Sequence, residues 1–323
     1  MKAITYYEYG SVDNLKLEEV PKPQPKKNEI CIKVHAASIN SWDWDLVQGT
    51  PFYVRLAGGG IKKPIKKIIG CDVAGIVESV GDGATLFKAG DEVFADISQY
   101  GWGGFAEYVC AKEKAFVHKP SGMSFMEAAA IPQAGVMALQ GIRDYRDIQP
   151  GEKVLINGAG GGVGTFAIQL AKLYDAHITA VDRTSKLDFM QTLGADEVID
   201  FTEEDFTERD AAYDLILDVV GHHSIYDYKR VLKPGGDYRM IGGASSLILQ
   251  SMFVAPFISM FGSKKMGILG HQPNKGLDHL IDLYSKNEVK PIIDSVFPLE
   301  ETRDAFEYFG KGHVKGKVVI KVL

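Results

Sequence analysis

The chain has 323 residues, which is enough for two domains, and its 46% hydrophobic and 24% charged residues are typical of a globular protein. A net charge of −6 and the lack of a long Lys/Arg run argue against a nucleic-acid partner. Met1–Gly10 has no apolar core of signal-peptide length, and the three cysteines show no CxxC spacing. We therefore expect a cytoplasmic protein with reduced thiols.

The first third of the chain predicts short strands separated by proline and glycine. Strands this short at this spacing indicate a compact, barrel-like all-β unit. The predicted strands are Ala3–Tyr7, Leu15–Val20, Ile30–Ser38, Asp72–Val80, Glu92–Ala95 and Phe105–Cys110.

The pattern changes near Ser124, which has the capping-box spacing to Glu127 at the start of a helix that Pro132 must kink or divide. Strands and helices then alternate, which predicts a parallel doubly wound sheet. The predicted strands are Lys153–Asn157, His177–Asp182, Glu197–Asp200, Leu215–Val220 and Tyr238–Gly242, with helices at Gly164–Tyr174 and Lys186–Leu193. The tail predicts helices at Leu277–Asn287 and Glu300–Phe309 and a last strand at Lys317–Val322.

The segment Leu247–Phe261 is strongly apolar, but it is shorter than the roughly 20 residues that span a bilayer. We expect no membrane span and interpret the segment as a buried or cofactor-side helix. An oligomer interface and a lid over an apolar substrate stay open as alternatives.

A glycine-rich turn follows the strand Lys153–Asn157 and opens directly into a helix. Gly161 and Gly164 occupy the second and third glycine positions of GxGxxG, while Ala159 stands at the first. The middle glycine lets the backbone approach a pyrophosphate, and the last lets helix and strand pack closely. We predict cofactor contacts from the residues of this turn, namely Gly158, Gly161, Gly162, Val163 and Gly164.

Asp182 ends the next strand about 20 residues after the middle glycine, where a carboxylate can accept hydrogen bonds from the adenosine ribose. This position slightly favours NADH. Arg183 and Lys186 follow, and these cations would accommodate the 2′-phosphate of NADPH, so we predict NAD(P)H. A solvated turn residue is the alternative for Asp182.

Two later strand ends fit the same site. Val220 follows one strand, and Gly242 and Gly243 follow the next. Because ligands bind at the carboxyl ends of the strands in such a sheet, we predict that these residues contact the nicotinamide half. Ordinary turn glycines are the alternative.

These motifs and their order resemble the medium-chain dehydrogenase/reductase superfamily, in its zinc-free quinone oxidoreductase-like branch. The resemblance covers nearly the whole chain. It implies an α/β fold with a GroES-like β-rich catalytic domain, formed by residues 1–123 and 288–323, and a Rossmann dinucleotide-binding domain with a doubly wound parallel sheet, formed by residues 124–287. The motifs are Ala37–Asn40, Gly70–Gly75, Gly103–Tyr108, Asn157–Gly164, Leu193–Asp196, Val198–Asp200 and Gly316–Val319.

Zinc-dependent relatives in this superfamily hold a catalytic metal with cysteine and histidine. By the resemblance, their ligand positions fall at Asn40, at Cys71 and near Pro132. One soft ligand does not make a zinc site, so we expect no metal and a buried structural role for Cys71.

Without a metal Lewis acid, alcohol oxidation is disfavoured, whereas a quinone or an α,β-unsaturated carbonyl can accept hydride directly from a nicotinamide. The resemblance places the Asn40 amide near the nicotinamide and Tyr53 facing the substrate. Asp43 matches an Asn-x-x-Asp pattern and would orient Asn40. The alternatives are a capping role for Asn40, a packing role for Tyr53 and a purely structural role for Asp43.

The sequence therefore predicts a zinc-independent NAD(P)H-dependent reductase of a small quinone or enone. Two alternatives are an alcohol dehydrogenase with a non-standard metal site and a non-catalytic dinucleotide-binding or redox-sensing protein. For the oligomeric state, similar proteins suggest a homodimer that forms through the edge of the Rossmann sheet.

Overall fold

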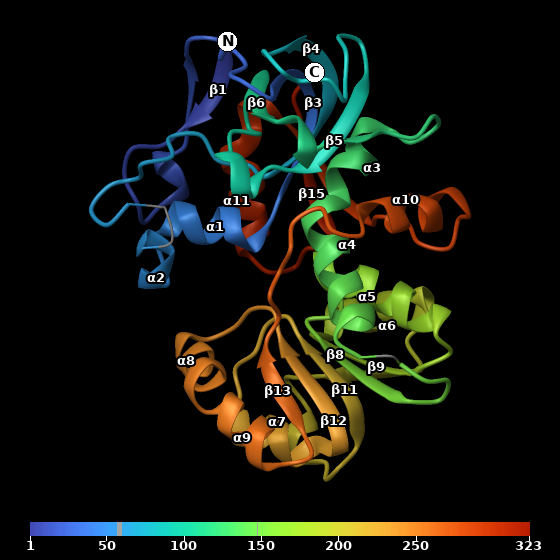
Figure 1. Cartoon of the computed structure of the whole chain (residues 1–323). Helices are drawn as coiled ribbons and strands as arrows, with labels where there is room; N and C mark the ends of the chain where they lie inside the picture. Colours follow the sequence, from blue (N-terminus) through green and yellow to red (C-terminus); the bar gives the residue numbers. More distant parts are fainter. Residues whose placement is uncertain (57–59, 147) are drawn as a thin grey trace. The chain divides into compact units, whose positions relative to one another are not determined.

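The computed structural model describes residues 1–56, 60–146 and 148–323, which form two compact units (Figure 1). Unit 1 consists of Met1–Ala134, Pro273–Ile281 and Pro291–Leu323. Unit 2 consists of Gly135–Gln272 and Asp282–Lys290. The fold is α/β, with an antiparallel-rich sheet in unit 1 and a parallel sheet in unit 2.

The described part of unit 1 is built on a sheet in which strands from both ends of the chain meet. Its order is β14-β15-β3-β4-β5-β7, β6 pairs with β3, and β1 and β2 form a separate hairpin. The last strand, β15, runs antiparallel to β3 and aligns Val318 with Ile39. The strands are β1 (Lys2–Thr5), β2 (Lys16–Glu19), β3 (Glu29–Ile39), β4 (Asp72–Val80), β5 (Glu92–Asp96), β6 (Tyr108–Lys112), β7 (Val117–His118), β14 (Ile293–Pro298) and β15 (Lys317–Lys321).

The helices of unit 1 are α1 (Ser41–Gln48), α2 (Phe52–Val54), α3 (Phe125–Ala130) and α11 (Thr302–Gly310), and α3 and α11 pack against its sheet. Two further helices, α4 (Pro132–Leu139) and α10 (Leu277–Ser285), begin in unit 1 and end in unit 2. Short 3-10 turns lie at Val12–Asn14, Ser98–Tyr100, Glu113–Ala115 and Leu299–Glu301.

Ser124 and Glu127 form the predicted capping box, in which the Glu127 N–H donates to Ser124 Oγ at 3.2 Å. Pro132 divides the helix as predicted, because α3 ends at Ala130 and α4 begins at Pro132. Helix α3 packs against β3, β4 and β15, so the segment 124–134, which we assigned to the Rossmann domain, belongs with unit 1.

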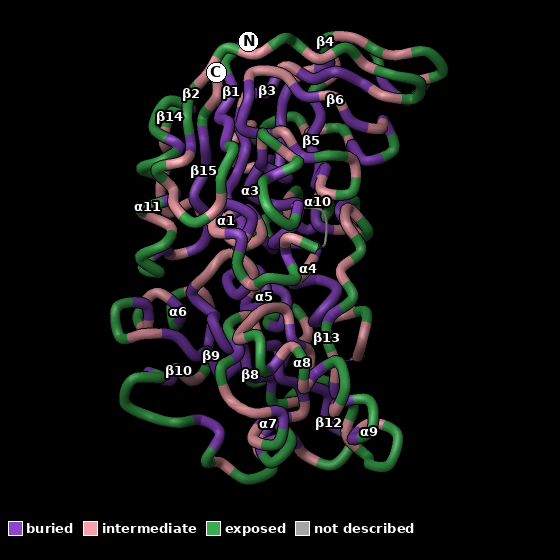
Figure 2. Tube along the Cα trace, turned by 90° about the vertical axis from the view of Figure 1, so that its left-hand side faces the viewer, coloured by how far each residue is buried: buried purple, intermediate pink, exposed green. Residues whose placement is uncertain are grey.

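Unit 2 contains, in its described residues, a parallel sheet of order β10-β9-β8-β11-β12-β13. This is the 3-2-1-4-5-6 order of a dinucleotide-binding sheet, and Figure 2 shows its central strands as mostly buried. The strands are β8 (Lys153–Asn157), β9 (His177–Asp182), β10 (Glu197–Asp200), β11 (Tyr213–Asp218), β12 (Leu232–Met240) and β13 (Lys265–Ile268). The helices are α5 (Gly162–Leu173), α6 (Leu187–Leu193), α7 (Ile225–Val231), α8 (Ser245–Phe253) and α9 (Ala255–Phe261), with a π-helical turn at Gln140–Asp144 and 3-10 turns at Thr184–Lys186 and Phe206–Glu208.

The apolar segment 247–261 differs from the prediction of a buried helix. It forms two helices, because α8 ends at Phe253 and Pro256 lies in the first turn of α9. Leu247 and Ile258 are buried, whereas Phe253 and Phe257 are 63% and 62% exposed. No helix in the described residues is long and apolar enough to cross a membrane.

Candidate active site

Asn40 lies where β3 ends and α1 begins. Its backbone N–H donates to Asp43 Oδ2 at 2.9 Å, and Asp43 Oδ1 accepts from the Gly70 N–H at 3.0 Å. Asp43 is fully buried, and this burial raises the pKa of its carboxyl to about 8. Asp43 therefore ties the backbone at Asn40 to the loop that precedes β4, and its role toward a substrate stays a prediction.

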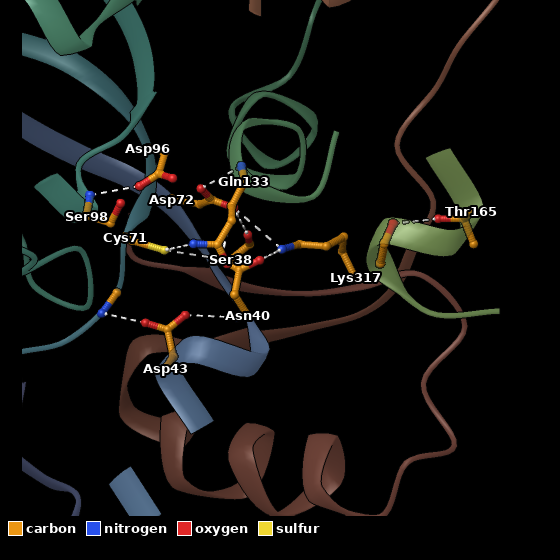
Figure 3. Close-up of polar contacts among 12 residues, drawn as sticks. Ser38, Asn40, Asp43, Cys71, Asp72, Asp96, Ser98, Gln133, Thr165 and Lys317 are labelled. Atoms are coloured by element: carbon orange, nitrogen blue, oxygen red, sulfur yellow. Dashed lines mark hydrogen bonds and ion pairs between the residues drawn. The ribbon is translucent and has the colours of Figure 1, made fainter. Parts of the chain in front are cut away.

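The side-chain amide of Asn40, the N-cap residue of α1, contacts polar side chains in the interior of unit 1 (Figure 3). Its nitrogen donates to Asp72 Oδ2 at 3.0 Å and lies 3.4 Å from Cys71 Sγ. Its oxygen accepts a short hydrogen bond from Lys317 Nζ. These contacts use both ends of the amide, so the orientation of Asn40 is determined by its neighbours.

Asp72 joins the strands and helices that surround Asn40. It is fully buried, and its Oδ1 accepts from the Gln133 N–H at 3.0 Å while its Oδ2 lies 3.5 Å from Lys317 Nζ. Burial raises the pKa of Asp72 to about 6, and the Lys317 ammonium opposes this rise. The Lys317 side chain is only 3% exposed, so a buried cation and a buried carboxyl compensate each other here.

Cys71 is surrounded by hydrogen-bond donors. Gln133 Nε2 donates a hydrogen bond to its sulfur at 3.3 Å, and the Asn40 side-chain nitrogen donates to the same sulfur. Burial raises the pKa of Cys71 well above its usual range, so the thiol stays protonated. The prediction of a buried Cys71 is confirmed.

Ligand atoms of Cys71, Asp72 and Asp96 lie within 4.8 Å of one another, which invites a test for a metal site. The Cys71 sulfur accepts from the Asn40 and Gln133 amides, and Asp72 Oδ2 accepts from Asn40 and lies 3.5 Å from Lys317 Nζ. Asp96 Oδ1 accepts from the Ser98 N–H at 2.7 Å. The three donors are one sulfur and two carboxylates, which is not the set of two cysteines and one histidine found in zinc alcohol dehydrogenases.

We call Asn40, Cys71, Asp72, Gln133 and Lys317 the buried polar cluster. Asn40 and Cys71 were singled out from the sequence, but the contacts of Asp72, Gln133 and Lys317 were not predicted. Asp72 and Lys317 stand in the motifs Gly70–Gly75 and Gly316–Val319, so a charged residue at the start of each buried strand was the available signal.

Tyr53 lies on α2 and is 38% exposed. Burial raises the pKa of its hydroxyl, and the nearby Asp45 adds to the rise. Within the described residues, no hydrogen bond joins Tyr53 to the buried polar cluster. Its predicted contact with substrate stays a prediction.

In unit 2, the predicted glycine turn joins β8 to α5. Gly158 has φ +79°, and a Cβ there would also lie 2.9 Å from Val220 Cγ2. A Cβ on Gly164 would lie 2.4 Å from the Ala159 Cα, so the helix and strand approach as closely as predicted. Gly161 is the N-cap of α5, and Gly162 and Val163 form its first turn, where backbone N–H groups lack helical partners.

Asp182 ends β9 beside this turn and contacts it directly. Its Oδ2 accepts from the Gly160 N–H at 3.0 Å, and its Oδ1 accepts from the Arg183 N–H at 2.9 Å. Lys186 Nζ lies 3.3 Å from Asp182 Oδ1, and the Lys186 side chain is only 6% exposed. Lys186, predicted as a phosphate-binding cation, is therefore buried and paired with the predicted ribose-binding carboxylate.

The ends of β11 and β12 meet beside the turn. Gly221 and Gly243 form a parallel bridge, and a Cβ on Gly243 would lie 2.3 Å from the Gly221 carbonyl oxygen. A Cβ on Gly242 would lie 2.8 Å from the Val219 carbonyl oxygen. Close backbone approach thus accounts for these glycines without a ligand, while Val220 is 43% exposed.

Comparison with known proteins supports both units. The profile of the alcohol dehydrogenase GroES-like domain matches residues 26–121, and the profile described as zinc-binding dehydrogenase matches residues 193–320. The chloroplast envelope quinone oxidoreductase homolog of Arabidopsis thaliana is 34% identical over 99% of this chain and 98% of its own. The NADPH-dependent alkenal/one oxidoreductase of the same plant is 33% identical over 99% of this chain and 79% of its own. The quinone oxidoreductase from Coxiella burnetii, a solved structure, is 31% identical, with a TM-score of 0.89 over 100% of this chain and 99% of its own.

The chain therefore belongs to the medium-chain dehydrogenase/reductase superfamily, with the GroES-like and Rossmann-like domains that the sequence predicted. Within that superfamily it is a member of the quinone oxidoreductase-like branch and an NAD(P)H-dependent oxidoreductase.

Proposed function

We propose that the chain transfers hydride from NADPH to a small quinone or α,β-unsaturated carbonyl without a metal. Unit 2 would bind the cofactor, and the buried polar cluster would support the acceptor side of the site. The observation that carries this proposal is the surroundings of Cys71, the one sulfur at the positions where zinc-dependent relatives hold their metal, because the neighbouring side chains Asn40 and Gln133 supply amide donors to it and no second sulfur or imidazole.

The chemistry needs no Lewis acid when the acceptor is conjugated. Hydride moves from nicotinamide C4 to the β-carbon of an enone, and the electron pair of the C=C bond shifts to the carbonyl oxygen. The enolate then takes a proton at its α-carbon, supplied by solvent. A quinone accepts hydride and one proton in the same way and becomes a quinol. Positioning and a positive potential near the developing oxyanion account for the acceleration.

The residues of unit 1 divide this task. We assign to Lys317 a positioning role, because its buried ammonium donates to the Asn40 oxygen and is compensated by Asp72. Asn40 would contact the nicotinamide or acceptor, and Asp43 would position Asn40 through its backbone N–H. Tyr53 remains the candidate for a substrate-facing hydroxyl, since it is part-exposed on α2.

For the cofactor, we propose a preference for NADPH over NADH, opposite to the slight preference that Asp182 suggested. Lys186 pairs with Asp182 and lowers its repulsion of a 2′-phosphate. Arg183 follows directly at the strand end and is half-buried, and we assign its guanidinium to the 2′-phosphate. The NADPH-dependent relative supports the same choice.

Steady-state NADPH oxidation with a panel of quinones and enones tests the function. We expect turnover that is unchanged by a chelator, and a preparation without stoichiometric zinc by elemental analysis. Asn40→Ala and Lys317→Met should lower kcat at least about tenfold, because the first removes the Asn40 amide and the second removes the ammonium that holds it in place. Tight NADPH binding with no turnover on any acceptor would favour a non-catalytic dinucleotide-binding protein instead.

A further inference from the structure

Two of the three cysteines of the chain lie opposite each other on neighbouring strands of unit 1, and we call them the cysteine pair. The antiparallel strands β3 and β6 lie side by side and align Cys31 with Cys110 (Figure 1). Their register is continuous from Glu29 to Lys33 on β3. Residues directly opposite in such a ladder place their side chains on the same face of the sheet. The two thiols are therefore neighbours, although they are far apart in the sequence.

Hydrogen bonds on either side of the cysteine pair determine its type. The Val34 N–H donates to the Glu107 carbonyl oxygen at 2.9 Å, and the Glu113 N–H donates to the Asn28 carbonyl oxygen at 3.1 Å. Both contacts continue the register that aligns the two cysteines. Along an antiparallel ladder, hydrogen-bonded pairs alternate with non-hydrogen-bonded pairs. Because the cysteine pair is an odd number of positions from both contacts, it is a non-hydrogen-bonded pair.

The backbone spacing of a non-hydrogen-bonded pair suits a disulfide. Its Cα atoms lie about 4.5 Å apart, and its side chains are closer together than those of a hydrogen-bonded pair. Disulfides join residues whose Cα atoms are about 4.4–6.8 Å apart. The Cys110 thiol already hydrogen-bonds to the Cys31 sulfur. A bond between the two sulfur atoms therefore requires no change in the pairing of β3 and β6.

A groove of about 530 Å³ in unit 1 gives access to the cysteine pair. Cys110 is half-buried and lines this groove together with Pro23 and Tyr108. Cys31 is fully buried, and its Sγ lies 3.9 Å from the Pro23 carbonyl oxygen. Cys110 is therefore the cysteine that a small oxidant in the groove reaches first, and Cys31 is the neighbour that can react with it afterwards.

The surroundings of the cysteine pair also favour one thiolate. The hydrogen bond from Cys110 lowers the pKa of Cys31, burial opposes this shift, and the Lys22 ammonium adds to it. Lys22 Nζ lies 3.9 Å from the centre of the Tyr108 ring and 2.6 Å from Glu78 Oε1. The same hydrogen bond raises the pKa of Cys110, so the two sulfurs share the proton that remains after the first is lost. One thiolate beside one thiol is the state from which a disulfide forms.

We propose that the cysteine pair is a thiol oxidation site, which a hydroperoxide converts reversibly into a disulfide. With the shared proton on Cys31, the Cys110 thiolate attacks the outer peroxide oxygen. An S–O bond forms, the O–O bond breaks, and the leaving oxygen takes a proton from solvent. The Cys31 sulfur then attacks the Cys110 sulfur, the S–S bond forms, and the S–O bond breaks. Water leaves with the Cys31 proton, so the two sulfurs together give two electrons to the peroxide. A dithiol reverses the reaction by exchange.

Peptide mapping without reduction tests the proposal on the full chain. The reduced protein is treated with hydrogen peroxide, its remaining thiols are alkylated under denaturing conditions, and the digest is analysed by mass spectrometry. We expect a linked peptide that contains Cys31 and Cys110 and that dithiothreitol separates. Cys71 is the internal control, because it is fully buried and its raised pKa keeps it protonated, so it should be recovered alkylated. The experiment uses neither NADPH nor an acceptor, so its result is independent of the proposed hydride transfer.

Single variants separate the two steps, and circular dichroism checks that each variant is folded. Cys31→Ser should give no linked peptide and leave a sulfenic acid on Cys110, which dimedone traps. Cys110→Ser should consume peroxide at least about tenfold more slowly than the wild type, because the accessible sulfur is gone. Recovery of both cysteines as free thiols in the wild type, at a peroxide concentration that oxidises glutathione, would overturn the proposal. A disulfide that joins two chains or includes Cys71 would overturn it as well.

Discussion

Replacing Lys317 by methionine removes the only cation that the described residues place against Asp72. The ammonium and the carboxylate oxygen are 3.5 Å apart, and their side chains are 3% and 0% exposed, so water cannot replace the lost partner. Removing one member of such a buried pair costs about 3–5 kcal/mol. Lys321→Met is the matched control, because Lys321 lies on the same strand but is exposed, and it should change stability by less than about 0.5 kcal/mol.

The pH dependence of this loss separates electrostatics from packing. Burial already raises the pKa of Asp72 to about 6, and loss of Lys317 raises it further. A carboxyl whose folded pKa lies above its unfolded pKa loses stability as pH rises between the two values. The difference in unfolding free energy between wild type and Lys317→Met, measured by urea denaturation, should therefore be larger at pH 8 than at pH 5. A loss no greater than that of Lys321→Met, or one independent of pH, would refute this account of the cluster.

The other predictions concern the same two units. Asp43→Asn removes a carboxyl whose folded pKa is about 8. The free energy of unfolding of the wild type should therefore fall relative to this variant by about 1.4 kcal/mol per pH unit between pH 4 and 8. Urea titrations in which both proteins show the same slope of unfolding free energy against pH would contradict this expectation. Gly164→Ala should cost at least about 1–3 kcal/mol and impair NADPH binding, because its Cβ would lie 2.4 Å from a backbone carbon. Gly267→Ala is its control, since the nearest atom is 3.6 Å away, and a similar loss for both variants would remove the steric explanation. Lys186→Met should weaken NADPH binding at least about tenfold more than NADH binding, because Asp182 would then face the 2′-phosphate uncompensated. Fluorescence titration with both cofactors gives the ratio of the two dissociation constants. An unchanged ratio would argue against the role of Lys186.

Strong local patterns made much of the fold predictable. The strands Asp72–Val80, Lys153–Asn157, His177–Asp182 and Glu197–Asp200 have the predicted bounds, because each is an apolar run that ends at glycine or at charged residues. The strand Lys265–Ile268 was missed, since its four residues include a lysine and a glycine and its strand character comes from pairing with β12. Propensity alone does not determine so short an edge strand.

The candidate site was predictable only where a motif carried it. Asn40 and Cys71 were marked by the resemblance, but Lys317 contacts Asn40 across 277 residues of sequence, and no spacing rule predicts such a contact. The pairing of Lys186 with Asp182 was equally hidden, because the two side chains meet through a 3-10 turn and not along a regular helix. Contacts of this kind depend on tertiary packing, which sequence spacing does not encode.

The most direct test of metal-free hydride transfer follows the hydride itself. NADPH that carries deuterium at the transferred C4 position is incubated with the enzyme, an enone and a chelator, and the product is analysed by mass spectrometry and NMR. We predict deuterium at the β-carbon of the saturated ketone, at the same rate with and without the chelator. Loss of transfer on chelation, restored by added zinc, would contradict the account, as would a product in which the deuterium is on the carbonyl carbon of an alcohol.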